Sequence, residues 1–180
     1  SWAIGYQPKI DTAISSGQIS SMDALNVFCR NGEVVSGILK AKTINVKAAE
    51  SLKILAATYV GGGNVAIGPA SKLIADYRLN LEAAEAINIG FAQTASGVGG
   101  TSILSKVLTS APQVSSYTTS ERHKKVTTTI TTQAAHCPSN VTLGSYDLET
   151  TQEASLLGTA VAAKENITIT TPKALVGAAV

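Results

Sequence analysis

The stretch from Gly61 to Gly100 constrains the chain more than any other, because two glycine clusters enclose a long run of helix-forming residues. The run opens near Pro69, a residue that the first turn of a helix accepts without loss. Ala, Leu and Glu dominate its interior. Its apolar side chains recur at the three- and four-residue spacing of a single helix face, at Ile74, Tyr77, Leu81 and Ala84. This pattern predicts one long central helix between two glycine hinges.

The second half of this predicted helix carries no charge after Ala86. An end that is apolar nearly all round is typical of a buried helix. Two interpretations follow. The helix is the core helix of the domain, or its C-terminal end inserts into a neighbouring subunit. Gly90 lies within this end and favours a third outcome, in which the helix stops there.

The rest of the chain places helical patterns before strand patterns. Apolar periodicity predicts helices over 9–16, 22–30 and 46–59, with a strand over 33–39 between them. After residue 115 the β-branched runs predict strands over 125–132, 140–143 and 167–170, and a helix is predicted over 147–164. The expected fold class is α+β, with a helical N-terminal half, a long central helix and then a Thr/Val-rich antiparallel β region.

This order also predicts the domain organisation. We expect a mainly helical lobe with an N-terminal arm over 1–96, a Gly/Ser-rich connection over 97–115, and a β-rich lobe with an apolar tail over 116–180. A single domain spanning all three parts is the alternative. No internal repeat is recognisable at the periods of solenoids or propellers.

The charge content is the composition value that bears on function. Charged residues make up 14% of the chain, whereas about 25% is typical. A free monomer normally keeps a charged surface to stay soluble. A subunit covered by neighbours has no such need. The composition therefore favours a subunit of an assembly.

Charge and hydropathy also bear on the classes of partner. The net charge of +2 is too small to indicate nucleic acid or an anionic membrane surface. No apolar run approaches the roughly 20 residues that span a bilayer. The opening residues SWAIGYQPKI lack the basic and apolar regions of a signal peptide. We expect no membrane span and no nucleic acid partner.

No motif in the chain carries recognisable catalytic chemistry. Gly63 and Gly68 have the spacing of a phosphate-binding loop, but Pro69 stands where the lysine is needed. His123, His136, Cys29 and Cys137 do not match the spacing of a zinc site. We therefore expect no enzyme, no catalytic or metal-ligating residues and no cofactor.

Two smaller features allow two interpretations each. Cys29 and Cys137 are either free, buried thiols or partners in one long-range disulfide. The charge cluster around Arg122, Lys124 and Lys125 is either a solvated turn before a strand or a contact for an anion.

These observations lead to a first functional hypothesis. The chain is a structural subunit that self-assembles into a viral or phage particle, as a coat, capsid or tail component, or into a surface filament. Its partners are other copies of itself and other structural proteins of the assembly. Its location is a virion or an extracellular assembly, with the cytoplasm as the alternative. Apolar arms and uncharged strands pair with neighbours by strand addition; the candidate contacts are Trp2, Ile4, Tyr6, Val126, Ile130, Leu175 and Val176.

The alternative hypothesis is a small binding module or enzyme. Its site would lie between the helical and β lobes, beside the basic cluster. Thermal melting with a ligand panel would separate the two hypotheses, because a bound ligand raises the melting temperature.

Overall fold

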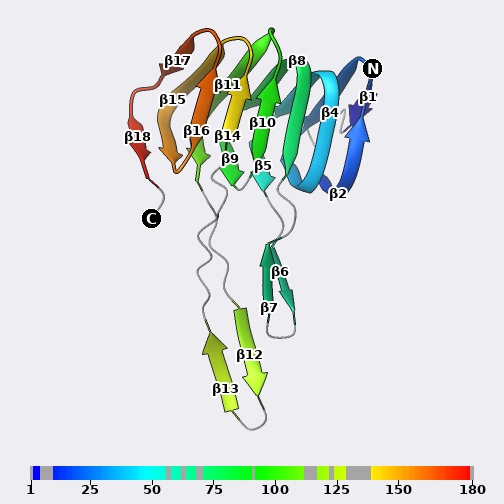
Figure 1. Ribbon diagram of the computed structural model, residues 1–180, viewed down its shortest axis with the longest axis vertical. Helices are drawn as coiled ribbons and strands as arrows, with labels where there is room; N and C mark the ends of the chain where they lie inside the picture. The colour runs from blue at the N-terminus through cyan, green and yellow to red at the C-terminus, as the bar shows by residue number, and fades with distance from the viewer. Residues whose placement is uncertain are drawn as a thin grey trace.

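The computed structural model describes residues 2–4, 10–55, 58–61, 64–67, 71–90, 92–111, 117–121, 124–128 and 139–178. All regular secondary structure in these residues is β-strand (Figure 1). The strands are β1 (Trp2–Ile4), β2 (Thr12–Ser20), β3 (Ala24–Cys29), β4 (Gly32–Ala48), β5 (Ser51–Leu55), β6 (Thr58–Gly61), β7 (Asn64–Ile67), β8 (Lys72–Ala83), β9 (Ala86–Gly90), β10 (Gln93–Ser96), β11 (Gly100–Ser110), β12 (Tyr117–Glu121), β13 (Lys124–Thr128), β14 (Ser139–Thr142), β15 (Tyr146–Leu157), β16 (Ala160–Ala163), β17 (Ile167–Thr170) and β18 (Ala174–Gly177).

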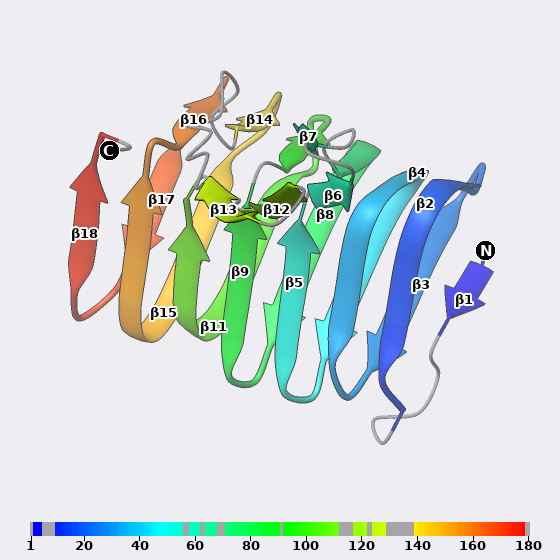
Figure 2. The same cartoon turned by 90° about the horizontal axis from the view of Figure 1, so that it is seen from below.

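The chain winds through three parallel-paired faces and returns to the first face one layer further along (Figure 2). Face I joins β2, β4, β5, β9, β11, β15 and β18. Face II joins the second half of β2, the middle of β4, the start of β8, β10, β14 and β16. Face III joins β1, β3, the end of β4, the end of β8 and the starts of β11 and β15 to β17. The described residues thus build a three-faced parallel β-solenoid, whose successive coils are marked on face I by the register partners Thr12, Gly32, Leu52, Ile87, Leu108 and Ala154.

The coil length is about 20 residues wherever the chain is uninterrupted. Thr12 pairs with Gly32 and Gly32 with Leu52, each 20 positions apart. Leu52 pairs with Ile87, and Leu108 with Ala154, at 35 and 46 positions. The two longer coils contain the antiparallel hairpins β6–β7 and β12–β13, both inserted where face I turns into face II. Figure 1 shows both hairpins extending from the same side of the solenoid.

The core is the inside of this solenoid. Side chains alternate along each strand, as a pleated strand requires, and the inward ones stack in columns from coil to coil. On face III one such column runs through Val27, Val46, Leu81, Ile103 and Leu148, each at most 3% exposed. On face I another runs through Leu52, Ile87, Leu108 and Ala154, each at most 1% exposed. The fold therefore needs only one aliphatic residue per column in each coil.

One part of the core is polar. Ser96 lies buried within hydrogen-bond distance of Thr101 at 2.7 Å and of Thr142 at 2.6 Å. The hydroxyl of Thr94 donates a hydrogen bond to the side-chain carbonyl of Asn140. Tyr146 lies inward in the same coil as Asn140, and burial raises the pKa of its hydroxyl. Buried polar groups in a core are tolerated when they pair with one another, as the Ser and Thr hydroxyls do here. The Tyr146 hydroxyl, by contrast, has no hydrogen-bond partner among the described residues.

The prediction of an α+β fold with a long central helix is wrong. The predicted helix is β8, β9 and β10. In β8 the inward side chains are Leu73, Ala75, Leu79, Leu81 and Ala83. Between Ala75 and Leu79 the chain turns a corner, and Asp76 and Tyr77 both point to solvent. Of the predicted helix face only Leu81 points inward, whereas Tyr77 and Ala84 are exposed. The Ala, Leu and Glu content also favoured a helix, but tertiary packing overrides helix propensity.

The other predicted helices are also strands. Residues 9–16, 22–30, 46–59 and 147–164 overlap β2, β3, the end of β4 with β5, and β15 with β16. The strands expected near 33–39, 140–143 and 167–170 are confirmed as β4, β14 and β17, but these strands pair in parallel. Among the described strands after residue 116, the expected antiparallel pairing occurs only between β12 and β13. The expected connection over 97–115 holds β11, which pairs with β8, β9 and β15.

The expectation of no solenoid repeat is likewise corrected. The repeat exists in the pairing register, at about 20 residues. It is hard to see in the sequence because two hairpins interrupt it and because the columns accept Ala, Val, Ile, Leu or Thr equally.

Glycines at one corner of the solenoid allow the coils to approach closely. At the turn from face II to face III, a Cβ on Gly97 would overlap the carbonyl oxygen of Asp76 in the preceding coil. A Cβ on Gly144, at the same corner one coil later, would lie 2.5 Å from the carbonyl oxygen of Val98. Only glycine fits where backbone meets backbone at this distance.

This corner supports a stability prediction. Gly97→Ala is expected to lower the free energy of unfolding by about 1–3 kcal/mol, because the backbone of the neighbouring coil must shift. Chemical denaturation measures the loss. Gly177→Ala is the matched control, because its Cβ would meet only Leu157 Cδ2 at 3.4 Å, and its cost is expected within about 0.5 kcal/mol. Equal costs for the two variants would contradict the close packing of coils at Gly97.

Candidate functional site

The described residues hold no arrangement of catalytic or metal-ligating groups. No three His, Cys, Asp or Glu side chains gather in positions suited to a metal ion in this part of the chain. His123, His136 and Cys137 lie outside the described residues. Asp147 and Glu149 are exposed on the outer side of face III, and Glu153 pairs with Lys173 at 3.0 Å. These three acids are thus on a strand rather than at the start of a helix.

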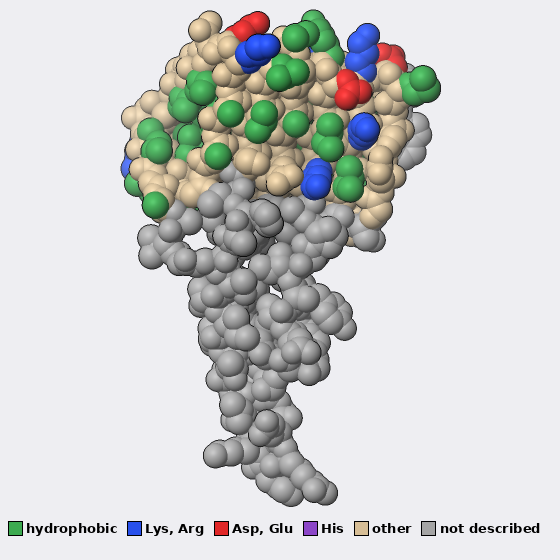
Figure 3. Space-filling model, in the orientation of Figure 1, with side chains coloured by type: hydrophobic (Ala, Val, Ile, Leu, Met, Phe, Trp, Pro, Cys, Tyr) green, Lys and Arg blue, Asp and Glu red, His purple; other side chains and the backbone are tan. Residues whose placement is uncertain are grey.

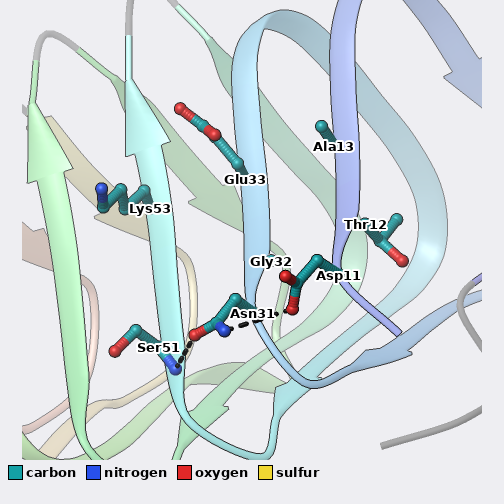
Figure 4. A pocket seen from close by; sticks show the side chains of 8 residues that line it. All are labelled: Asp11, Thr12, Ala13, Asn31, Gly32, Glu33, Ser51 and Lys53. Atoms are coloured by element: carbon teal, nitrogen blue, oxygen red, sulfur yellow. Dashed lines mark hydrogen bonds between the residues drawn. The ribbon is translucent and has the colours of Figure 1, made fainter. Parts of the chain in front are cut away.

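A shallow groove of about 260 Å³ crosses face I where β2, β4 and β5 adjoin (Figure 4). Its floor is tied together by hydrogen bonds between coils. Asn31 donates to Asp11 at 3.2 Å and accepts from the backbone N–H of Ser51 at 3.2 Å. Arg30 donates to both carboxylate oxygens of Asp11, at 2.9 and 2.8 Å. The polar groups around Asp11 therefore hold neighbouring coils together.

The Asp11 carboxyl is the most perturbed acid of this groove. Hydrogen bonds from Arg30 and then from Asn31 lower its pKa from an ordinary 3.8 to about 2. An acid with so low a pKa stays ionised at neutral pH and is a poor general base. Asp11 is therefore better suited to holding the coils together than to transferring a proton.

The lowered pKa gives a pH prediction. Because the folded-state pKa lies below the unfolded value, the ionised Asp11 contributes stability above about pH 4, and this contribution is lost as the pH falls toward 2. The melting-temperature difference between wild type and Asp11→Asn is expected to shrink over that interval. An NMR titration of the carboxyl carbon should give a midpoint near 2. In Arg30→Gln the midpoint should rise toward 3.8, and a wild-type midpoint already near 3.8 would contradict the pairing.

Two further shallow grooves of about 320 and 240 Å³ follow one another along face III and share Ser102 and Leu104. An amide ladder borders the first: Asn80 donates to Asn45 at 2.6 Å, and Asn45 to Asn26 at 2.8 Å. Across the groove Lys47 and Glu82 form an exposed ion pair at 3.4 Å. These contacts again join successive coils. Exposed ion pairs of this kind contribute about 0–1 kcal/mol.

The solenoid surface is otherwise poor in charge. On the face seen in Figure 3, charged side chains are sparse and hydrophobic ones are spread among polar groups. At the turn from face III to face I, acids and bases one coil apart are paired, as in Glu85 with Lys106 at 3.0 Å. The part of the lateral surface seen in Figure 3 is therefore mostly uncharged.

The feature that stands apart is the edge formed by β16, β17 and β18. Each of these strands pairs on one side only within the described residues. Their inward columns continue those of the core, but the side chains are open to solvent. Tyr146, Leu148 and Leu156 are 1%, 1% and 5% exposed, whereas Ile167, Ile169 and Val176 in the next coil are 48%, 40% and 72% exposed. We call this surface the C-terminal edge.

The strands of the C-terminal edge are short, with four residues each, but their sequences offer no other protection of a free strand. Natural proteins blunt exposed edges with charged residues, proline or bulges. The strands AVAA, ITIT and ALVG contain neither a charge nor a proline. Unpaired N–H and C=O groups and apolar side chains thus lie together on one surface, which suits the addition of another strand layer.

The opposite side of the stack is the N-terminal edge, formed by β1 and β2. Within the described residues β1 pairs only with β3, and β2 only with β4. These strands are also without charge or proline, with the sequences WAI and TAISSGQIS. Figure 2 shows the two edges at opposite ends of the solenoid.

The structure sorts the predicted inter-subunit contacts into three groups. Leu175 and Val176 lie on the C-terminal edge, 49% and 72% exposed. Trp2 and Ile4 lie in β1, at the N-terminal edge. Val126 lies in β13, while Tyr6 and Ile130 are outside the described residues.

Sequence reasoning missed Ile167 and Ile169 as edge residues. The alternation of ITIT marked them as a strand. Only the stacking of coils shows that their inward side is uncovered.

The predicted anion contact is untested by the fold. Lys124 and Lys125 lie in β13 and are paired in register with Glu121 and Ser120. Arg122 is outside the described residues. An anion contact there remains a prediction.

Cys29 is a free, buried thiol, which confirms the first interpretation for this cysteine, and burial raises its pKa. The alternative hypothesis placed a site between a helical lobe and a β lobe, but the described residues contain no helical lobe. Among the described residues, no helix has the length and hydropathy to cross a membrane.

A scan against protein-family models and searches of curated proteins and of solved structures returned no match.

Proposed function

We propose that the protein is a structural subunit that self-associates through the edges of its β-solenoid. The observation that carries this proposal is the exposure of Ile167, Ile169 and Val176, whose column neighbours one coil earlier are almost completely buried. The fold supplies a rigid column, and the C-terminal edge supplies the surface by which that column adds to another. The partner is a second copy of the same chain.

The energetic argument rests on what the edge leaves uncovered. Covering a Val or Ile side chain contributes roughly 1.5–3 kcal/mol. Pairing an edge strand also satisfies its backbone groups, each worth about 0.5–1.5 kcal/mol net. Association costs at least about 4 kcal/mol in lost freedom, so several such contacts are required together. The three strands of the C-terminal edge provide them in one surface.

The setting of this function is also a proposal. A neutral, Thr- and Ala-rich column suits a coat, capsid or tail component of a virus or phage, or a surface filament, in a virion or an extracellular assembly. Support comes from the low charge content of 14%.

Sedimentation velocity across a concentration series tests the proposal. The weight-average sedimentation coefficient is expected to rise with concentration as copies add. A single boundary at the monomer value from micromolar to millimolar protein would overturn the proposal. The experiment uses the 180-residue chain.

A further inference from the structure

We infer that the copies stack head to tail, the C-terminal edge of one copy on the N-terminal edge of the next, so that the columns of faces I and III run on across the joint. This inference rests on the proposed function and adds the partner edge, the direction and the register. Its first support is that the two edges hold successive positions of the same columns.

On face I the column through Gly32, Leu52, Ile87, Leu108 and Ala154 begins at Thr12 and reaches Ala174. Its neighbour begins at Ile14 and reaches Val176. In a continued stack, Ala174 of one copy thus lies beside Thr12 of the next, and Val176 beside Ile14. The solvent-facing position between them joins Leu175 to Ala13.

On face III the continuation is supplied by β1. Trp2 and Ile4 hold the register positions of Leu25 and Val27, which are inward and buried. The same columns reach Ile167 and Ile169 in β17. Pairing of β17 with β1 of the next copy would therefore place apolar positions opposite apolar positions, with backbone hydrogen bonds between them.

The two edges are also stepped so that they fit. β18 extends the C-terminal edge by one strand on face I alone, and β1 extends the N-terminal edge by one strand on face III alone. In a head-to-tail joint these strands lie in the same layer, and together they form two faces of one composite coil. If two C-terminal edges faced each other, their β18 strands would meet on face I, and the strands of face III would be held apart.

The charged residues at the two edges also favour head-to-tail stacking. Lys173 and Asp11 precede Ala174 and Thr12, so they stand in one column at the turn into face I. Lys173 is 70% exposed on its side chain beside its partner Glu153. A head-to-tail joint sets it next to an acid, which repeats the acid–base pairing of Asp11 with Arg30 and Glu85 with Lys106 between coils. A contact between unlike edges does not close on itself in a straight stack and produces an open filament.

Cysteine cross-linking tests direction and register together. In a Cys137→Ser background, Ala13→Cys and Leu175→Cys place thiols on the outer side of the joint. Neighbouring strands lie about 4.8 Å apart, within the Cα separation of about 4.4–6.8 Å that a disulfide spans. The double variant is expected to give a ladder of covalent oligomers on a non-reducing gel, while each single variant gives none. Ala13→Cys with Glu33→Cys, register partners within one copy, is the positive control for bond formation.

The other outcomes separate the two proposals. Covalent dimers from Leu175→Cys alone, with no ladder from the double variant, would overturn head-to-tail stacking and leave self-association standing. Oligomers in sedimentation without cross-links in the double variant would also overturn the inferred register. Monomers in sedimentation would overturn the proposed function itself.

Discussion

Leu79→Ala is expected to lower the free energy of unfolding by about 2–5 kcal/mol, the usual cost of removing a fully buried leucine side chain. Leu79 is 0% exposed and points into the solenoid from β8, in the column with Ile44 and Thr101. Urea denaturation followed by circular dichroism at the β-sheet band measures the loss.

Leu104→Ala is the matched control for this prediction. Leu104 lies on β11 in the neighbouring coil, points outward and is 38% exposed. The same chemical change there is expected to cost less than about 1 kcal/mol. Similar losses at the two sites would contradict the inward and outward assignment on face III, and with it the coil architecture.

Val176→Asp is expected to weaken self-association by roughly a hundredfold or more, because an unpaired buried charge costs about 3–5 kcal/mol. Val176 is 72% exposed in the single copy, so folding of the chain should be unaffected. An aspartate side chain is too short to reach solvent from within a joint. Sedimentation equilibrium measures the association constant, and thermal melting at low concentration checks the fold.

Leu175→Asp provides the control on the same strand. Its side chain faces outward, beside Ala13 in the inferred joint, and it should leave association within about tenfold of wild type. The pair separates burial at a specific joint from a general effect of negative charge. If both variants, or neither, abolished association, the inward column would not be the contact surface.

The strands of this fold could be predicted from the sequence where β-branched residues are concentrated. The alternating run ITIT at 167–170 and the Val-rich run at 33–39 met this condition. The region around Leu79 did not, since Ala, Leu and Glu are good helix formers and the corner at Asp76 and Tyr77 interrupts the alternation. Parallel coils pair each strand with residues about 20 to 46 positions away, and a local sequence window does not contain that partner.

The candidate site could be predicted in part. Leu175 and Val176 were identified as an uncharged apolar tail, and Trp2 and Ile4 as an apolar arm. Their relationship could not be inferred, because it depends on the columns that connect the two edges through every coil. The grooves on faces I and III had no sequence signal, since residues such as Asn31 and Ser51 come together only through the stacking of β4 on β5.

The low charge content acquires a structural reason from the fold. In the columns that run between coils, hydroxyl and amide side chains on the outer faces hydrogen-bond to their neighbours one coil away, as in the ladder from Asn26 to Asn80. Such ladders stabilise the stack without placing a charged side chain beside a like charge in the next coil. The same property suits a surface that continues from one copy to the next.

Electron micrographs of the purified chain test the account most directly. Stacking of solenoid on solenoid predicts rods of constant width whose length increases with protein concentration, and Val176→Asp should leave only single short particles. Single particles of one size at every concentration, in wild type and variant alike, would contradict it.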